Sequence, residues 1–125
     1  MPKKILVVDD SETMRIDVRE ALESEGYDVV EAVNGLDGVQ VAQSHPDLAL
    51  IMTDLNMPDM DGITMVQEIR KFPLYNLIPV FMLTTETSPD LKARGKEAGV
   101  ICWIVKPFNS DKVMPIVRKI LSVSQ

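Results

Sequence analysis

The stretch Ile5-Leu6-Val7-Val8-Asp9-Asp10 decides the fold, because four apolar residues run directly into two adjacent carboxylates. Three further apolar runs lie at Leu48–Met52, Ile78–Leu83 and Val100–Val105. Such nearly continuous runs are typical of parallel strands that helices cover on both faces. A fifth segment, Tyr27–Ala32, contains two acidic residues and is predicted to be an edge strand.

Five helical patterns follow these strands, so that the chain reads as βα repeated five times. Strand starts lie 21–30 residues apart, and this alternation predicts an α/β fold with a doubly wound, parallel, five-stranded sheet. Pro115 removes an early hydrogen bond of the last helix, so we expect that helix to start late or to kink. The helices are predicted from Ser11 or Glu12 to Glu25, and at Gly35–Gln43, Gly62–Lys71, Ser88–Gly99 and Ser110–Leu121.

Length and composition predict one globular domain over residues 1–125. The chain is 46% hydrophobic and 26% charged, which argues against disorder, and no apolar run is long enough to span a membrane. The N-terminus lacks the apolar core and cleavage site of a signal peptide. The single cysteine, Cys102, excludes an intrachain disulfide and a cysteine-based zinc site. We therefore expect a cytoplasmic protein. We also expect no output domain after the last helix, because the sequence leaves no room for one there.

The charge is distributed unevenly along the chain. Residues 1–62 carry 14 acidic and 4 basic side chains, whereas residues 63–125 carry 5 acidic and 9 basic ones. This asymmetry fits either a cation-binding first half or charges scattered over solvated helix faces. The formal net charge of −6 argues against non-specific binding to nucleic acid.

Polar side chains follow four of the predicted strands at the point where each strand ends. The strands end in Asp9-Asp10, Thr53-Asp54, Thr84-Thr85 and Lys106-Pro107. The carboxyl ends of parallel strands meet at one edge of an open sheet, where ligands bind. Three carboxylates, a hydroxyl and an ammonium group are therefore expected to converge there.

This set of groups favours a phosphoryl site with a bound cation. Taken alone, an aspartate after a strand is usually a helix cap. Thr84 alone would be interpreted as a hydroxyl at a strand end, and Lys106 alone as a solvated lysine. Three carboxylates in a partly desolvated cleft repel one another, and a hard cation such as Mg²⁺ relieves that repulsion and completes its shell with phosphate oxygens. Lys106 and Thr84 would then neutralise and hydrogen-bond the phosphoryl group.

Four stretches, taken in order, resemble the response-regulator receiver domain: Val7–Ser11, Met52–Gly62, Leu83–Glu86 and Val105–Phe108. The resemblance covers essentially the whole chain. It implies the flavodoxin-like fold with strand order 2-1-3-4-5, of which the chemotaxis regulator CheY is a well-known example. A single receiver domain of this kind is most similar to the stand-alone, CheY-type regulators of chemotaxis.

The resemblance implies a role for each residue of the expected cluster. Asp54 would be the phosphoacceptor, which takes a phosphoryl group from a histidine kinase. Asp10, Asp54 and the main-chain carbonyl of Asn56 would coordinate Mg²⁺, and Asp9 would act mainly through water. Lys106 would pair with the carboxylate and then with the phosphoryl oxygens, and its peptide bond to Pro107 would be cis.

Four further residues would carry the switch and set the phosphoryl lifetime. Thr84 would bond a phosphoryl oxygen in the active state. Trp103 stands where the family has an aromatic switch residue, commonly Tyr or Phe. Asn56 and Glu86 occupy the positions that govern the lifetime, and both are able to orient an attacking water.

These roles imply a binding module that phosphorylation switches, rather than an enzyme. The only reactions that we expect it to catalyse are its own phosphorylation and dephosphorylation. We expect a monomer whose downstream protein target binds residues 88–121. This region has more basic than acidic residues and therefore suits an acidic partner.

A phosphorelay shuttle or phosphate sink is the alternative within this class. A Mg²⁺-dependent aspartyl phosphohydrolase is the alternative among enzymes, although enzymes that resemble haloacid dehalogenases use an Asp-x-Asp pair rather than adjacent aspartates. A flavin carrier would need a different loop after the first strand.

Overall fold

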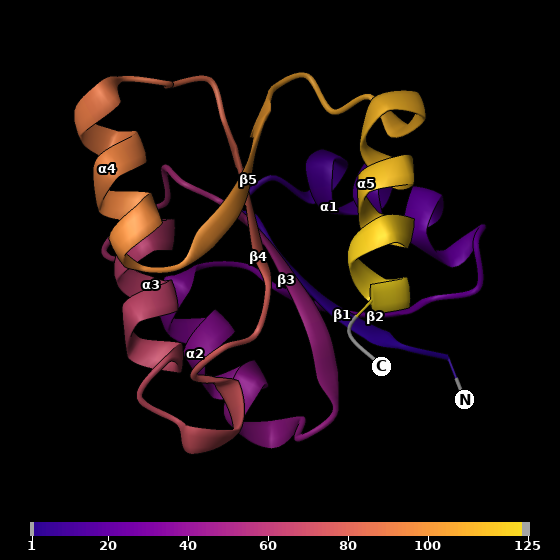
Figure 1. Ribbon diagram of the computed structural model, residues 1–125, viewed down its shortest axis with the longest axis horizontal. Helices are drawn as coiled ribbons and strands as arrows, with labels where there is room; N and C mark the ends of the chain where they lie inside the picture. The colour runs from indigo at the N-terminus through magenta and orange to yellow at the C-terminus, as the bar shows by residue number, and fades with distance from the viewer. Residues whose placement is uncertain (1, 124–125) are drawn as a thin grey trace.

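The computed structural model describes residues 2–123, without the side chain of Val123. It contains five βα units in chain order (Figure 1). The strands are β1 (Lys4–Val8), β2 (Asp28–Ala32), β3 (Leu48–Asp54), β4 (Val80–Thr84) and β5 (Val100–Val105). The helices are α1 (Glu12–Glu23), α2 (Gly35–Ser44), α3 (Gly62–Ile69), α4 (Pro89–Glu97) and α5 (Ser110–Val123), with a 3₁₀ turn, η1, at Pro73–Tyr75.

The five strands form one parallel sheet in the order β2-β1-β3-β4-β5. This is the order that the resemblance implies, with Asp28–Ala32 at one edge as expected. Because β1 lies between β2 and β3, the chain moves outward on one side of β1 and then on the other, and the carboxyl ends of β1 and β3 are adjacent. The doubly wound fold class is therefore confirmed.

Helices cover both faces of the sheet, as Figure 1 shows: α1 and α5 lie on one side, and α2, α3 and α4 on the other. Each face has its own apolar core. On the first face, Phe81 of β4 is fully buried among residues of α1 and α5. On the second, Ile51 of β3 packs with Ile63 and Met65 of α3. Strand side chains alternate between the two cores, which explains why the predicted runs are apolar at nearly every position.

Side-chain caps fix where four of the helices begin. In each, the capping oxygen accepts a hydrogen bond from the main-chain N–H three residues on, which satisfies one of the unpaired donors at a helix start. The caps are Ser11 for α1, Asn34 for α2, Asp61 for α3 and Ser88 for α4. Those of α1 and α3 lie at the ends of the loops that leave β1 and β3, so they also fix the loops at the carboxyl edge of the sheet.

The last helix differs from the sequence-based expectation. It begins at Ser110, as the predicted range has it, and runs through Pro115, so of the two effects expected of Pro115 the late start does not occur. Asn109 provides the start instead: its side chain accepts from the Asp111 N–H at 3.0 Å, and its carbonyl accepts from Lys112 and Val113. Burial of the apolar stripe of this helix against the sheet offsets the one hydrogen bond that Pro115 cannot donate.

Two smaller differences concern the segment before β4. The strand begins at Val80 rather than Ile78, because Pro79 has no N–H to donate to a ladder. The 3₁₀ turn η1 is the second difference, since the sequence does not predict it. Tyr75 holds it in place, because its hydroxyl donates to the carbonyl of His45 and accepts from the Leu48 N–H at 3.0 Å.

Candidate functional site

The structure places the polar strand ends at one edge of the sheet. Asp9 follows β1, Asp54 ends β3, Thr84 ends β4 and Lys106 follows β5. Carboxylate oxygens of Asp9, Asp10 and Asp54 lie within 4.8 Å of one another. Asp9 and Asp54 are 3% and 6% exposed, whereas Asp10 is exposed to solvent. The cluster therefore opens to solvent on the Asp10 side and is closed by the sheet beneath.

Lys106 is the cation of this cluster. Its Nζ lies 3.1 Å from Asp54 Oδ1 and 3.4 Å from Asp9 Oδ2, so it bridges the two buried carboxylates. The main-chain N–H of Lys106 donates to the carbonyl of Thr84 at 3.0 Å, and the Lys106–Pro107 peptide bond is cis. The contact with Asp54 is expected from the sequence; the second contact, with Asp9, is a finding of the structure.

The electrostatics follow from burial and from these neighbours. Burial and the negative charge of Asp9 raise the pKa of Asp54, and Lys106 opposes both effects. Burial lowers the pKa of Lys106, but its hydrogen bond to Asp54 and the charge of Asp9 outweigh that, so the pKa is raised overall. One ammonium group thus faces three carboxyl groups, which is an excess of negative charge that a divalent cation would neutralise.

A chain of hydrogen bonds joins the loops after β3 and β4. Asn56 Nδ2 donates to Glu86 Oε1 at 2.8 Å, and the Glu86 N–H donates to Thr84 Oγ1 at 2.9 Å. The Thr84 side chain is buried, while Asn56 and Glu86 are exposed. The predicted lifetime residues therefore contact each other at the mouth of the cluster, and Glu86 also contacts the predicted switch hydroxyl.

Trp103 of β5 lies against α4. It is half-buried on β5 and packs with the core on the α2–α4 face of the sheet. A Cβ built on Gly95 of α4 would meet its Cζ2 atom at 2.4 Å, so only glycine lets the helix approach the indole this closely. The position of Trp103 is therefore coupled to the position of α4.

We expect Gly95→Ala to displace the indole. The added methyl overlaps the ring, so Trp103 moves outward or α4 shifts, and the emission spectrum moves to longer wavelength with stronger iodide quenching. Trp103 is the only tryptophan, so its fluorescence reports this directly. Lys96→Ala, at the neighbouring exposed position of α4, is the matched control. Equal spectra for Gly95→Ala and wild type would show that the helix and the indole are not coupled.

Two residues to which the sequence assigns no role in the cluster also contribute to the site. Gly62 starts α3 directly beside Asp54, and a Cβ there would lie 2.3 Å from the Asp54 carbonyl oxygen. Arg15 of α1 is buried, and its Nη1 donates to the carbonyl of Asp9 at 2.6 Å. The sequence signal for Arg15 is Glu31, an acidic residue between apolar residues of the second strand, with which Arg15 forms an ion pair at 3.0 Å.

This arrangement can bind a doubly charged phosphoryl group beside a carboxylate nucleophile. Lys106 is available to neutralise charge, Thr84 to donate a hydrogen bond, and the aspartates to bind a metal. Among residues 2–123, no helix is both long enough and apolar enough to cross a membrane.

Comparison with known proteins gives consistent matches along most of the chain. The family model described as "response regulator receiver domain" matches residues 5–118. Chemotaxis protein CheY1 of Helicobacter pylori is 40% identical over 106 residues, which cover 84% of this chain and 86% of that protein. The CheY homolog of Campylobacter jejuni is 39% identical over 106 residues, covering 84% and 82% of the two chains.

Solved structures agree with the sequence matches. CheY4 of Vibrio cholerae superposes with a TM-score of 0.91 at 38% identity, covering 96% of this chain and 99% of that one. A chain of the CheX–CheY–BeF3–Mg complex of Borrelia burgdorferi superposes with a TM-score of 0.88 at 29% identity, covering 96% and 90%. The chain belongs to the response regulator receiver domain family.

Proposed function

We propose that this protein is a response regulator of chemotaxis signalling that accepts a phosphoryl group on Asp54 from a histidine kinase. The observation that carries the proposal is a buried Asp54 in contact with the Lys106 ammonium, at 3.1 Å, beside two further aspartates. The chemotaxis assignment rests on the similarity to proteins named CheY.

The reaction of Asp54 is a phosphoryl transfer to a carboxylate. An Asp54 oxygen attacks the phosphorus, the new O–P bond forms, and the P–N bond to the kinase histidine breaks, so that the imidazole leaves with the electron pair. Lys106 neutralises charge at the carboxylate and the phosphoryl oxygens. Hydrolysis removes the phosphoryl group: water attacks the phosphorus, the O–P bond to Asp54 breaks, the carboxylate leaves with the electron pair, and inorganic phosphate is released.

Mg²⁺ is the cofactor that this site fits best. Asp10, Asp54 and the main-chain carbonyl of Asn56 would hold it, with Asp9 acting through water. The three carboxylates within 4.8 Å of one another match the preference of Mg²⁺ for oxygen ligands. When bound, the ion supplies charge neutralisation and alignment of the phosphoryl donor with the acceptor.

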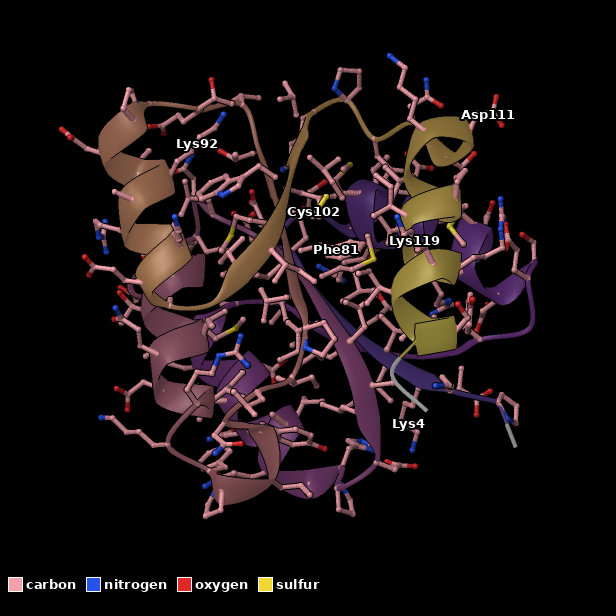
Figure 2. All side chains as sticks on the ribbon, in the orientation of Figure 1. Lys4, Phe81, Lys92, Cys102, Asp111 and Lys119 are labelled. Atoms are coloured by element: carbon pink, nitrogen blue, oxygen red, sulfur yellow. The ribbon has the colours of Figure 1, made fainter. Side chains whose placement is uncertain are left out.

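The output surface is the face formed by α4, β5 and α5, within residues 88–121. Figure 2 shows Lys92 on α4 and Lys119 on α5, the helices that precede and follow β5 in the chain. The apolar side chains Ile101 and Val105 of β5 are exposed. A partner with acidic and apolar residues matches this surface. Besides Lys106, which belongs to the carboxylate cluster, the basic residues of the region are Lys92, Arg94, Lys96, Lys112, Arg118 and Lys119.

A small acyl phosphate separates this function from that of a phosphohydrolase. With Mg²⁺ present, the intact protein should gain the mass of one phosphoryl group, and a small phosphate ester should not be turned over. Sustained hydrolysis of the ester, at a rate that Asp54→Ala abolishes, would instead assign the protein to the phosphohydrolases.

Thr84→Ala should separate phosphorylation from switching. The variant keeps Asp54 and Lys106, so labelling by the acyl phosphate persists, but the hydroxyl that would bond the phosphoryl group is lost. We expect most of the phosphorylation-dependent change in Trp103 fluorescence to disappear. Thr85→Ala, at the adjacent exposed position, is the control and should behave as wild type. A full fluorescence response in Thr84→Ala would exclude Thr84 from the switch.

A further inference from the structure

Arg15 ties α1 to the turn that carries two of the three clustered carboxylates. Its side chain is 11% exposed. Nη1 donates to the main-chain carbonyl of Asp9 at 2.6 Å, in a buried position, and Nε donates to Glu31 Oε1 at 3.0 Å. A guanidinium group is planar and presents its donors in a fixed fork, so these two partners together determine where the Asp9 carbonyl lies.

The Asp9 carbonyl belongs to the peptide unit that leads into Asp10. Because that unit is planar, holding its oxygen also fixes the direction in which the chain enters Asp10. The same turn is held on its other sides: the Asp9 N–H donates to the Ala32 carbonyl at 3.2 Å, and the Ser11 N–H donates to Asp9 Oδ1 at 2.9 Å. Arg15 adds a side-chain bond to the peptide oxygen between the two aspartates.

The charge of Arg15 is balanced within an ion-pair network. Arg15 pairs with Glu31, and Arg19 of the same helix pairs with Glu31 as well. Arg19 also pairs with Glu23, at 3.6 Å, so two cations face two carboxylates. Arg15 therefore affects the carboxylates mainly by fixing their positions and less through its net charge. A lysine could keep the charge but has no fork with which to hold both Asp9 and Glu31.

We propose that Arg15 is a positioning residue that sets the Mg²⁺ affinity of the Asp9, Asp10 and Asp54 cluster by fixing the peptide between Asp9 and Asp10. The inference rests on the proposed function, because it takes that cluster as the Mg²⁺ site. Groups that orient the ligands of a metal typically change its affinity by about 10- to 100-fold when they are removed.

The test is the dissociation constant of Mg²⁺ alone, measured by titration calorimetry on the full chain. For Arg15→Met we expect it to rise about tenfold or more, and Arg15→Lys should raise it similarly. Arg19→Met, which removes an exposed cation from the same ion-pair network, should leave it within about twofold of wild type on this reasoning. Val117→Ala, in the core of α5, should lower the melting temperature yet leave the dissociation constant unchanged.

The outcomes separate the two proposals. Absence of Mg²⁺ binding by the wild type would overturn the proposed metal site. Wild-type affinity in both Arg15 variants would overturn only the role of Arg15, as would full rescue by lysine, since charge alone would then account for the effect. Circular dichroism in EDTA checks the fold, and Arg15→Lys decides the matter if Arg15→Met does not fold.

Discussion

Asp54→Ala should abolish phosphoryl labelling by a small acyl phosphate, because Asp54 is the proposed nucleophile and neither of the other two carboxylates can replace it. Asp54 is buried and lies 3.1 Å from the Lys106 ammonium group. Asp9 is also buried near Lys106, but its Oδ1 accepts a hydrogen bond from the Ser11 N–H, and Asp10 is exposed. Loss of the nucleophile removes the covalent step altogether, so we expect labelling to fall to background. The measurement is the mass of the intact protein after incubation with the donor and Mg²⁺.

Asp59→Asn is the matched control for that experiment. Asp59 is exposed, lies in the loop that follows Asp54 and has a positive φ of 70°, a conformation that asparagine tolerates. This variant should be labelled as fully as wild type, and wild type in EDTA should not be labelled. Labelling of Asp54→Ala at the wild-type level would show that another residue accepts the phosphoryl group.

Mg²⁺ should raise the melting temperature substantially. Without the ion, three carboxylates lie close together with one ammonium group to offset them, which is unfavourable. A ligand at 100 times its dissociation constant adds about 2.7 kcal/mol to the free energy of unfolding. For a domain of this size that corresponds to a rise of roughly 10 °C, which differential scanning calorimetry with and without EDTA would measure.

Asp10→Asn tests whether this stabilisation comes from the cluster. The substitution removes one carboxylate oxygen pair and one negative charge, so most of the Mg²⁺ effect should vanish and the metal-free protein should become slightly more stable. Asp17→Asn, at an exposed position of α1, changes the net charge equally and should leave the Mg²⁺ effect intact. Equal Mg²⁺ effects in the two variants would place the ion elsewhere.

The positions of the main site residues could be predicted because they depend on topology alone. Asp9, Asp54, Thr84 and Lys106 each end or follow a strand, and parallel strands bring their carboxyl ends to one edge whatever the details of packing. The order of the strands follows from the resemblance to a family rather than from periodicity, since the apolar runs do not say which strands are neighbours.

Contacts that depend on side-chain reach could not be predicted in the same way. The bond from Arg15 to the Asp9 carbonyl and that from Asn56 to Glu86 join residues whose separation in space is set by helix rotation and loop shape. The late start expected for α5 is wrong for a related reason. The sequence shows that Pro115 removes a hydrogen bond, but it does not show how the whole helix packs against the sheet. That packing, which offsets the lost hydrogen bond, depends on the fold.

Switching requires that a change at Asp54 reach the α4–β5–α5 face. Shifting a two-state population from 1:99 to 99:1 needs about 5.5 kcal/mol of differential stabilisation. New charge-assisted hydrogen bonds from Lys106 and Thr84 to a phosphoryl group are of the strong kind that can supply much of it. Trp103 packs closely against Gly95 of α4, so a shift of the helix and a rotation of the indole accompany each other.

The most direct test is the fluorescence of Trp103 on addition of beryllofluoride, a phosphoryl mimic, together with Mg²⁺. We predict a spectral shift and reduced quenching by iodide as the indole moves inward, with binding of the mimic confirmed independently by calorimetry. An unchanged Trp103 signal in the protein with bound mimic would contradict the proposed switch, because phosphorylation would then leave the α4–β5–α5 face as it was.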